Sequence, residues 1–493
     1  MFLCIEKKYM KIFITVLLFF ILTSFAEFPP ETPWSGTQTI TNLANPNYLQ
    51  TVRDTVYNVN ITRISDETVF GKSGGAIQHQ YSKVQAWNCD MSLISLGFTT
   101  ILDASDYSLI GTLEIGMSLV DGRWSNVYPE IRYFCDGEYL KKVNVLTKEV
   151  TTLHRFDGYV TCRIGPWEGN ITQDDRYVVV TSLDEKSASV YDIKNNAVLG
   201  TRSFSSTFDW ASMTPWGDYV VVSYRGTGDT RLYDLNFNFI RILSKYQSHA
   251  DFAIDTEGNK VFVEMCPLRM VRIDNGRETD LLPETVFTSG ICRISTYNPW
   301  VCGHVSGRCF SMPGWVLISA GIDDCNDGLG GYYNRTEIFY LKLDGSGTIK
   351  FLGHTRTDFS NYEAEAKAVI SPDGSKAMFT SNWNVNGNGG DACDYVVEFA
   401  GNTSTIDQNN NHSDQENTSL KIYPNPFNPS TTISILGEQA GDVSIYDING
   451  RLVYSINNVK QFDWNVDNMT SGIYIVKAQV GNKIFTKKIT LIR

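Results

Sequence analysis

The feature that most constrains the fold is a unit that recurs between about Val69 and Phe399. Each unit holds an apolar strand, a tight turn rich in Asp and Gly, a second apolar strand and a third strand that often ends in Asp. The turns lie at Cys89-Asp90, Asp136-Gly137, Asp174-Asp175, Gly217-Asp218, Glu257-Gly258, Pro313-Gly314 and Asp373-Gly374. Strand-like runs such as Tyr219-Val220-Val221-Val222 follow most of these turns and are too apolar to face water.

The spacing of the turns indicates the size of one unit. Gly217 and Gly258 are 41 residues apart and Gly314 and Gly374 are 60 apart, which fits a four-stranded blade with insertions in the later units. A four-stranded sheet cannot bury both faces alone, whereas a closed ring of sheets buries each face against a neighbour. Seven turns therefore predict an all-β protein with a seven-bladed β-propeller over residues 67–400. A pair of β-sandwiches is the alternative architecture.

One copy of the unit carries a motif found in other propellers. The run Ser371-Pro372-Asp373-Gly374-Ser375-Lys376-Ala377-Met378-Phe379 resembles the blade motif of TolB-type and WD40-like propellers, in which the Asp-Gly turn joins the first two strands. This resemblance implies the propeller fold and no particular function, because propellers of many functions share the motif. Residues 27–66 lack clear periodicity, so we expect them to form an N-terminal extension or a strand that closes the ring.

The N-terminus has the pattern of a secretory signal peptide. Lys7, Lys8 and Lys11 precede an apolar run over residues 12–22, and the small residues Ser24 and Ala26 follow at the spacing of a cleavage site. The run is shorter than the roughly 20 apolar residues that a spanning helix needs. We therefore expect residues 1–26 to be removed during export.

The overall charge and the cysteines exclude two classes of site. The chain carries 42 Lys and Arg against 54 Asp and Glu, a formal net charge of −12 at pH 7, which would repel the phosphates of a nucleic acid. It has ten cysteines but no C-x-x-C pair, so a zinc ribbon is not expected. An exported chain can form disulfides, although the pairing cannot be deduced from the sequence.

The C-terminal segment carries the most specific motif. Residues 401–419 are almost without apolar side chains and are expected to be a linker. Residues 420–493 then open with Tyr423-Pro424-Asn425-Pro426 and continue with the hairpin Tyr446-Asp447-Ile448-Asn449-Gly450-Arg451 and a basic final strand. This segment resembles the C-terminal sorting domain of proteins exported by the type IX secretion system. The resemblance implies a small β-sandwich, an interaction with that secretion machinery, and a secreted or cell-surface location. A generic adhesion or carbohydrate-binding sandwich is the alternative.

Candidate ligand-binding residues lie where the innermost strands of the blades begin, because propellers usually bind ligands in the central funnel. Counting back nine residues from Gly258 gives His249, and from Gly374 gives Glu365. Nearby positions at the start of other innermost strands hold Glu130, Glu168, Asp209 and His304. Such carboxylates and imidazoles could bind a divalent metal, calcium or manganese, and we predict His249, His304 and Glu365 as its ligands.

This set of residue types resembles the oligogalacturonate lyase type of propeller. In that family a metal neutralises a uronate carboxylate while a side chain abstracts the adjacent proton. The resemblance makes His249, His304, His354 and Arg308 candidate catalytic residues, with Tyr246 as a further proton donor. No distinctive lyase motif is present, and a structural role for His249 and His304, each bonded to a neighbouring blade, is the alternative.

Three functions are compatible with these patterns. The first is an exported propeller that binds an extracellular ligand such as a glycan. The second is a uronate polysaccharide lyase or a hydrolase with its active site in the funnel. The third is a structural or adhesive surface protein, which would bind neither glycans nor small ligands.

Overall fold

The chain folds into two compact units, Met1–Thr403 and Ser404–Arg493. The computed structural model describes residues 29–35, 38–70, 77–113, 122–166, 168–225, 228–245, 249–265, 268–282, 303–320, 336–357, 362–383 and 392–400 of the first unit. In the second it describes residues 419–423, 427, 429–436, 439–447, 451–466, 469–470, 472–481 and 483–491. The predicted signal segment, most of the linker and the Pro-Asn-Pro opening lie outside these ranges. No helix within them is long and apolar enough to cross a membrane.

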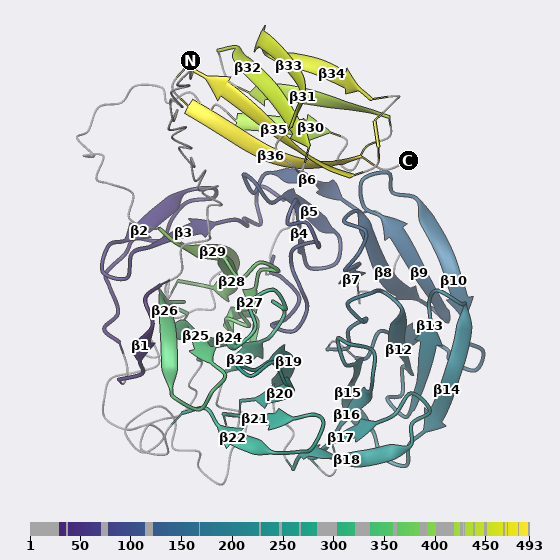
Figure 1. Ribbon diagram of the computed structural model, residues 1–493. Coiled ribbons are helices and arrows are strands. Elements are labelled where there is room, and N and C mark those ends of the chain that lie inside the picture. The colour runs from purple at the N-terminus through teal and green to yellow at the C-terminus, as the bar shows by residue number, and fades with distance from the viewer. Residues whose placement is uncertain are drawn as a thin grey trace, which may run out of the picture. The chain divides into compact units, whose positions relative to one another are not determined.

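Nearly all the regular structure of the first unit is β-strand, in sheets whose strands follow one another along the chain (Figure 1). The first three sheets contain β4 (Leu93–Leu96), β5 (Thr100–Asp103) and β6 (Leu109–Thr112); β7 (Arg123–Trp124), β8 (Ile131–Asp136), β9 (Tyr139–Asn144) and β10 (Val150–Arg155); and β11 (Cys162–Arg163), β12 (Tyr177–Ser182), β13 (Ser187–Asp192) and β14 (Ala197–Ser203). The next two contain β15 (Phe208–Met213), β16 (Val220–Tyr224), β17 (Thr230–Tyr233) and β18 (Phe239–Ser244); and β19 (Ala250–Ile254), β20 (Lys260–Glu264), β21 (Arg269–Arg272) and β22 (Glu278–Asp280).

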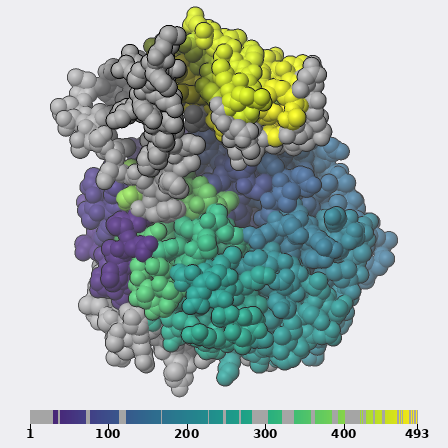
Figure 2. Space-filling view, viewed as in Figure 1, coloured from purple at the N-terminus to yellow at the C-terminus, as the bar shows by residue number. Residues whose placement is uncertain are grey.

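The last two sheets combine strands from both ends of the unit. One contains β23 (His304–Ser306), β24 (Trp315–Ser319), β25 (Glu337–Lys342) and β26 (Thr348–His354), with β1 (Thr32–Pro33) paired to β26. The other contains β27 (Val369–Ile370), β28 (Lys376–Ser381) and β29 (Cys393–Phe399), and the short helix η3 (Tyr362–Ala364) precedes it. Its outer edge is completed by β3 (Val59–Arg63) and β2 (Thr51–Asp54). In the space-filling view the purple N-terminal residues accordingly lie beside the green residues of these sheets (Figure 2).

Apolar clusters between neighbouring sheets close the ring. Val190 of β13 and Val222 of β16 share one cluster, and each further pair of neighbouring sheets shares another. The series returns to its start, because Val396 of β29 and Ile94 of β4 belong to the cluster that joins the last sheet to the first. Burial against two neighbours explains why the strands are apolar on both faces. The predicted all-β propeller is thus confirmed. The described residues of the ring form seven sheets, and the predicted blade count of seven stays a prediction.

One of the predicted turns was assigned wrongly. Asp136-Gly137 joins β8 to β9, the second and third strands of its sheet, and not the first and second. The first turn of this sheet spans residues 125–130, where the Ser125 hydroxyl accepts hydrogen bonds from the backbone N–H groups of Val127 (3.1 Å) and Tyr128 (2.7 Å). A serine hydroxyl can organise a turn without glycine, so the Asp/Gly signal did not reveal it.

The second unit is a β-sandwich of two antiparallel sheets, as predicted. The sheets contain β30 (Ser419–Tyr423), β31 (Ser430–Leu436) and β34 (Gln461–Asn465); and β33 (Leu452–Val459), β32 (Gly441–Asp447), β35 (Gly472–Val480) and β36 (Lys483–Leu491). Both sheets contribute to one apolar core, in which Ile433 and Ile445 are almost completely buried. Asp447 accepts hydrogen bonds from the backbone N–H of Arg451 (3.0 Å) and from its guanidinium (3.1 Å), which ties together the two ends of the β32–β33 turn.

Candidate functional site

The innermost strands of the ring all run in the same direction, because each sheet is a meander that starts at the centre and ends at the outside. The residues that begin these strands, or precede them, therefore gather at one end of the central axis. We call this group the axial mouth and define it as Tyr81, Lys83, Glu168, Asp209, His249, His304 and Glu365. Glu168 follows β11 but precedes Ile171, which forms an isolated bridge to Val178 of β12 at the inner edge of the same sheet. The segment with Tyr81 and Lys83 leads to Trp87, which forms an isolated bridge to Ile94 of β4 and is the innermost residue of its sheet.

Four residues from four different sheets meet at the axial mouth. The Tyr81 hydroxyl is hydrogen-bonded to Nδ1 of His249. The rings of His249 and His304 lie 4.4 Å apart between centroids, and the Tyr81 ring meets His304 edge-on at 5.1 Å. Nε2 of His304 lies 3.7 Å from a carboxylate oxygen of Glu365. The sheets therefore place His249 and Glu365, which the nine-residue spacing selects, on either side of His304.

Burial keeps both imidazoles uncharged at neutral pH. It lowers the pKa of His249 to about 4, and the nearby Lys83 ammonium acts in the same direction. Burial and the adjacent His249 hold the pKa of His304 well below its ordinary value. The pKa of Tyr81 is raised by its burial and by the Glu168 carboxylate, so the phenol stays protonated. His304 is only 5% exposed, and its Nε2 makes no hydrogen bond within the part of the chain that the structure describes.

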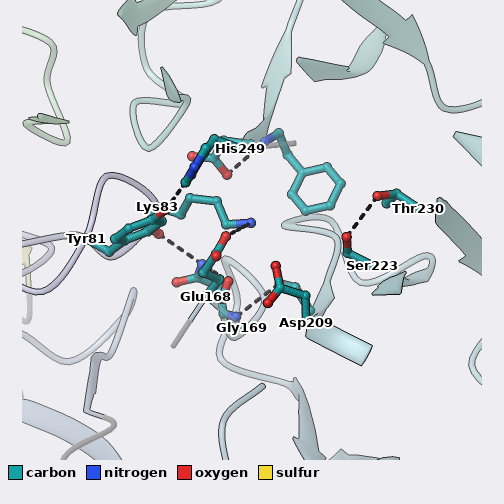
Figure 3. A network of polar contacts seen from close by, with 12 residues as sticks. Tyr81, Lys83, Glu168, Gly169, Asp209, Ser223, Thr230 and His249 are labelled. Carbon is teal, nitrogen blue, oxygen red and sulfur yellow. Dashed lines mark hydrogen bonds and ion pairs between the residues drawn. The ribbon is translucent and has the colours of Figure 1, made fainter. Parts of the chain in front are cut away.

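A buried ion pair lies beside His249 (Figure 3). Lys83 Nζ is 2.7 Å from a carboxylate oxygen of Glu168 and 3.4 Å from the centre of the Trp210 ring. Burial acts on both partners, lowering the pKa of Lys83 and raising that of Glu168, while their contact opposes both shifts. Asp209 lies on the other side and pairs with Arg225 at 3.2 Å. The mouth thus combines charged groups with uncharged imidazole and phenol groups.

The predicted metal site does not find support in this arrangement. In the described ranges no group of three or more His, Cys, Asp or Glu side chains is placed to hold a metal ion. Nδ1 of His249 is occupied by Tyr81, whereas Nε2 of His304 and a carboxylate oxygen of Glu365 lie 3.7 Å apart, a separation that two ligands of one ion can have. The predicted calcium or manganese site stays a prediction.

Other predicted residues lie away from the axial mouth. Arg308 follows β23 and forms a buried ion pair with Asp251 of β19, with Nε 2.9 Å from the carboxylate. His354 ends the outer strand β26, where Nε2 donates to the Gln38 carbonyl at 3.1 Å. Glu130 lies in the turn between β7 and β8, at the far end of β7. It was predicted to begin an innermost strand because the Asp136-Gly137 turn was misassigned. Tyr246 lies outside the described residues.

Sequence reasoning missed two residues of the mouth, Tyr81 and Lys83. A signal for Tyr81 was present, because counting nine residues back from Asp90 of the Cys89-Asp90 turn reaches it. This turn has no glycine, so the count was not applied there. Lys83 has no comparable signal, since a lysine in an irregular segment is normally solvent-exposed.

Comparison with known proteins identifies the second unit. Residues 421–492 match the family model described as the secretion system C-terminal sorting domain. The chain therefore carries a type IX sorting domain and is secreted, being either released or attached at the cell surface. No curated protein matches the chain.

Several solved structures resemble the chain at low identity. The WD40 domain of Neurospora crassa Pan2 is 11% identical with a TM-score of 0.41, and the match covers 65% of this chain and 89% of that one. A chain of the mitotic checkpoint complex is 11% identical with a TM-score of 0.42, covering 72% and 98%. The β-propeller domain of Myceliophteria thermophila Cps50 (Swd1) is 12% identical with a TM-score of 0.40, covering 66% and 99%.

Proposed function

We propose that this exported propeller binds an uncharged, hydroxyl-rich glycan at its axial mouth. The observation that carries the proposal is the meeting of Tyr81, His249, His304 and Glu365 from four sheets, with a buried imidazole nitrogen that has no hydrogen-bond partner in the described ranges. Buried polar atoms in folded proteins are nearly always satisfied, and an unsatisfied one beside a partly exposed carboxylate is suited to a ligand hydroxyl.

The carboxylates of the mouth are accessible enough to accept hydrogen bonds from a ligand. The side chains of Glu168, Asp209 and Glu365 are 14%, 25% and 32% exposed, and they come from three different sheets. Sugar hydroxyls can donate to such carboxylates and accept from a neighbouring ammonium such as that of Lys83. Bonds to charged groups are stronger than bonds between neutral groups, so a few of them suffice for specific binding.

The charge balance of the mouth favours a neutral glycan over an acidic one. Lys83 is paired with Glu168, and Arg225 is paired with both Asp209 (3.2 Å) and Glu185 (3.4 Å). A uronate carboxylate would therefore meet cations that already have anionic partners, and it would also be repelled by Glu365. Neutral hydroxyls suffer no such repulsion.

The contact between Tyr81 and His249 favours glycan cleavage as a second candidate function. A protonated phenol can give a proton, and an uncharged imidazole can accept one, so the pair has the groups for general acid and base catalysis. Uronate elimination additionally needs the substrate carboxylate to be neutralised. Arg308, the predicted arginine for this role, is engaged with Asp251. This candidate predicts release of reducing ends from a bound neutral glycan, abolished by Tyr81→Phe.

A polysaccharide panel with matched variants tests the proposal. The full exported chain is assayed for binding to neutral and acidic polysaccharides, together with Glu365→Gln and Glu130→Gln. Both substitutions replace a partly buried carboxylate, but only Glu365 belongs to the mouth. Loss of one charge-assisted hydrogen bond predicts roughly 10- to 100-fold weaker binding for Glu365→Gln and unchanged binding for Glu130→Gln. Absence of binding to every neutral polysaccharide, or equal effects of the two variants, would contradict the proposal.

A further inference from the structure

An exposed aromatic ring lies beside the axial mouth and has no part in the contacts described so far. Tyr362 begins the short helix η3 and is 59% exposed. Its carbonyl accepts a hydrogen bond from the backbone N–H of Glu365 at 3.3 Å, and the Glu365 side chain contacts His304 within the mouth. Partial burial of the phenol and the carboxylates of Glu365 and Glu168 raise the pKa of Tyr362, so both carboxylates lie within electrostatic range of its hydroxyl.

One face of the Tyr362 ring is covered by a lysine. Lys367 Nζ lies 3.5 Å from the centre of the ring and donates to the Tyr362 carbonyl at 2.7 Å. Lys367 is buried and adopts a φ of 43°, in the left-handed region that residues other than glycine rarely occupy. A ring that is held on one face and is still 59% exposed presents its other face to solvent.

The helix that carries this ring is anchored on both sides. Gln78, from the segment that leads into the first sheet, donates through Nε2 to the Glu363 carboxylate. The Thr357 hydroxyl donates to the carbonyl of Ala364, whose side chain is fully buried. The ring is therefore fixed before a ligand arrives, which reduces the entropy lost on binding.

The surroundings of the open face indicate what it can bind. The exposed Glu363 and the partly exposed Glu365 flank Tyr362 in the chain, so an occupant must offer an apolar face to the ring and hydrogen-bond donors to carboxylates. A sugar ring has both, with C–H groups on its face and hydroxyls around its edge. A cationic ligand is disfavoured because the Lys367 ammonium across the ring would repel it, and an acidic ligand is disfavoured by the carboxylates.

We infer that Tyr362 is a stacking subsite for a neutral sugar ring adjacent to the one bound at the axial mouth, so that the ligand is an oligosaccharide of at least two residues. His304 is 5% exposed and Tyr362 is 59% exposed, so a ligand that contacts both extends from inside the mouth to its rim. This inference rests on the function proposed for the mouth and specifies the class of its ligand.

Calorimetric titration of the full exported chain tests the inference. The probes are the monosaccharide and the tetrasaccharide prepared from the neutral polysaccharide that binds most tightly in the panel, and the tetrasaccharide should bind at least tenfold more tightly. Tyr362→Ala should weaken tetrasaccharide binding at least tenfold and leave monosaccharide binding within about twofold. Tyr362→Phe keeps the ring and should stay within about threefold of the unsubstituted protein. The matched control is Tyr128→Ala, which removes a ring of equal exposure (58%) in the turn between β7 and β8 and should change neither affinity.

Two further measurements accompany the titration. Urea midpoints of each variant identify a folding defect. Saturation-transfer NMR, with the aromatic protons irradiated, should show transfer to the C–H protons of the bound tetrasaccharide, and Tyr362→Ala should reduce this transfer whereas Tyr362→Phe should not.

The outcomes separate this inference from the proposed function. Unchanged tetrasaccharide binding in Tyr362→Ala, together with weaker binding in Glu365→Gln, would overturn the subsite and leave the function proposed for the mouth standing. Tighter binding of a glucosamine tetrasaccharide, whose amines are cationic, than of the neutral one would also overturn the subsite. Weaker binding in Tyr362→Ala without any change in Glu365→Gln would support the stacking and contradict the role of the mouth. Absence of binding to every neutral polysaccharide would overturn both.

Discussion

The ion pair between Asp251 and Arg308 offers a sharp test of how the innermost strands are held together. Asp251 lies on β19 and Arg308 follows β23, so the pair joins two neighbouring sheets. Their side chains are 1% and 7% exposed. The Asp251 carboxylate accepts hydrogen bonds from Arg308 Nε at 2.9 Å, from Arg308 Nη2, and from the backbone N–H groups of Gly307 and Phe252, both at 2.8 Å.

The size of the effect follows from what each substitution leaves behind. Arg308→Met removes the cation and leaves a buried carboxylate with two remaining donors, the N–H groups of Gly307 and Phe252, which predicts a loss of about 3–5 kcal/mol in the free energy of unfolding. Asp251→Leu combined with Arg308→Met removes both charges and leaves both N–H groups without this acceptor. Replacing a buried pair by apolar groups is often neutral, and each orphaned N–H costs about 1–3 kcal/mol. The double variant should therefore lose about 2–6 kcal/mol, and its loss comes from the two N–H groups and not from a buried charge.

Urea unfolding of the full chain, followed by tryptophan fluorescence of the propeller transition, measures these values. The control is Lys260→Met, which breaks an exposed ion pair with Asp218 in which both side chains are 41% exposed. This control should cost about 1 kcal/mol or less. A loss below about 1 kcal/mol for Arg308→Met, or a loss for Lys260→Met as large as that for Arg308→Met, would refute the reasoning.

Further predictions concern closure of the ring, pH and the thiols. Ile61 on β3 is 1% exposed, and Ile61→Ala should lower the free energy of unfolding in urea by about 2–5 kcal/mol. Val56 is 68% exposed, and Val56→Ala should lower it by less than about 0.5 kcal/mol. Equal losses for the two variants would argue against closure of the ring through β3. Because the pKa of His249 falls from 6.5 unfolded to about 4 folded, only the unfolded chain binds this proton between these values, so stability should decrease as the pH is lowered from 6.5 to 4. His249→Gln should flatten this slope of urea midpoint against pH, and an unchanged slope would contradict the shift. Burial raises the pKa of Cys309 to about 11 and, with help from a neighbouring aspartate, that of Cys89 to about 12, so neither should react with iodoacetamide at pH 8 before unfolding. Peptide mass mapping checks this, and labelling of either thiol in the native protein would contradict it.

Much of the fold could be predicted because neighbours in the ring are also neighbours along the chain. A meander pairs each strand with the next one, so local turn and strand signals were sufficient for runs such as residues 177–180, which lie in β12. The strands β1 to β3 gave no such signal. Ile61 pairs with Val397, more than 300 residues away, and no local pattern encodes a partner so distant. The turn at Asp136-Gly137 was misassigned because a Gly turn can join any two strands of a blade. Its residues alone therefore do not say which two strands it connects.

Residues chosen by their position in the blade lie at the candidate site, whereas residues chosen by residue type alone lie elsewhere. Counting back from turn glycines reached His249 and Glu365, which both lie beside His304. His354 was chosen for its residue type alone, and it lies on an outer strand against Gln38. Arg308 was likewise chosen by type, and its partner Asp251 could not be foreseen because the pair joins different sheets.

The most direct test of the central claim is a crystal structure of the exported protein with the neutral oligosaccharide that binds most tightly in the panel. We predict density for the sugar at the axial mouth, with a hydroxyl bonded to Nε2 of His304 and another to the carboxylate of Glu365. Density for that oligosaccharide only on the outer strands or on the C-terminal unit, with the axial mouth free of it, would contradict the account.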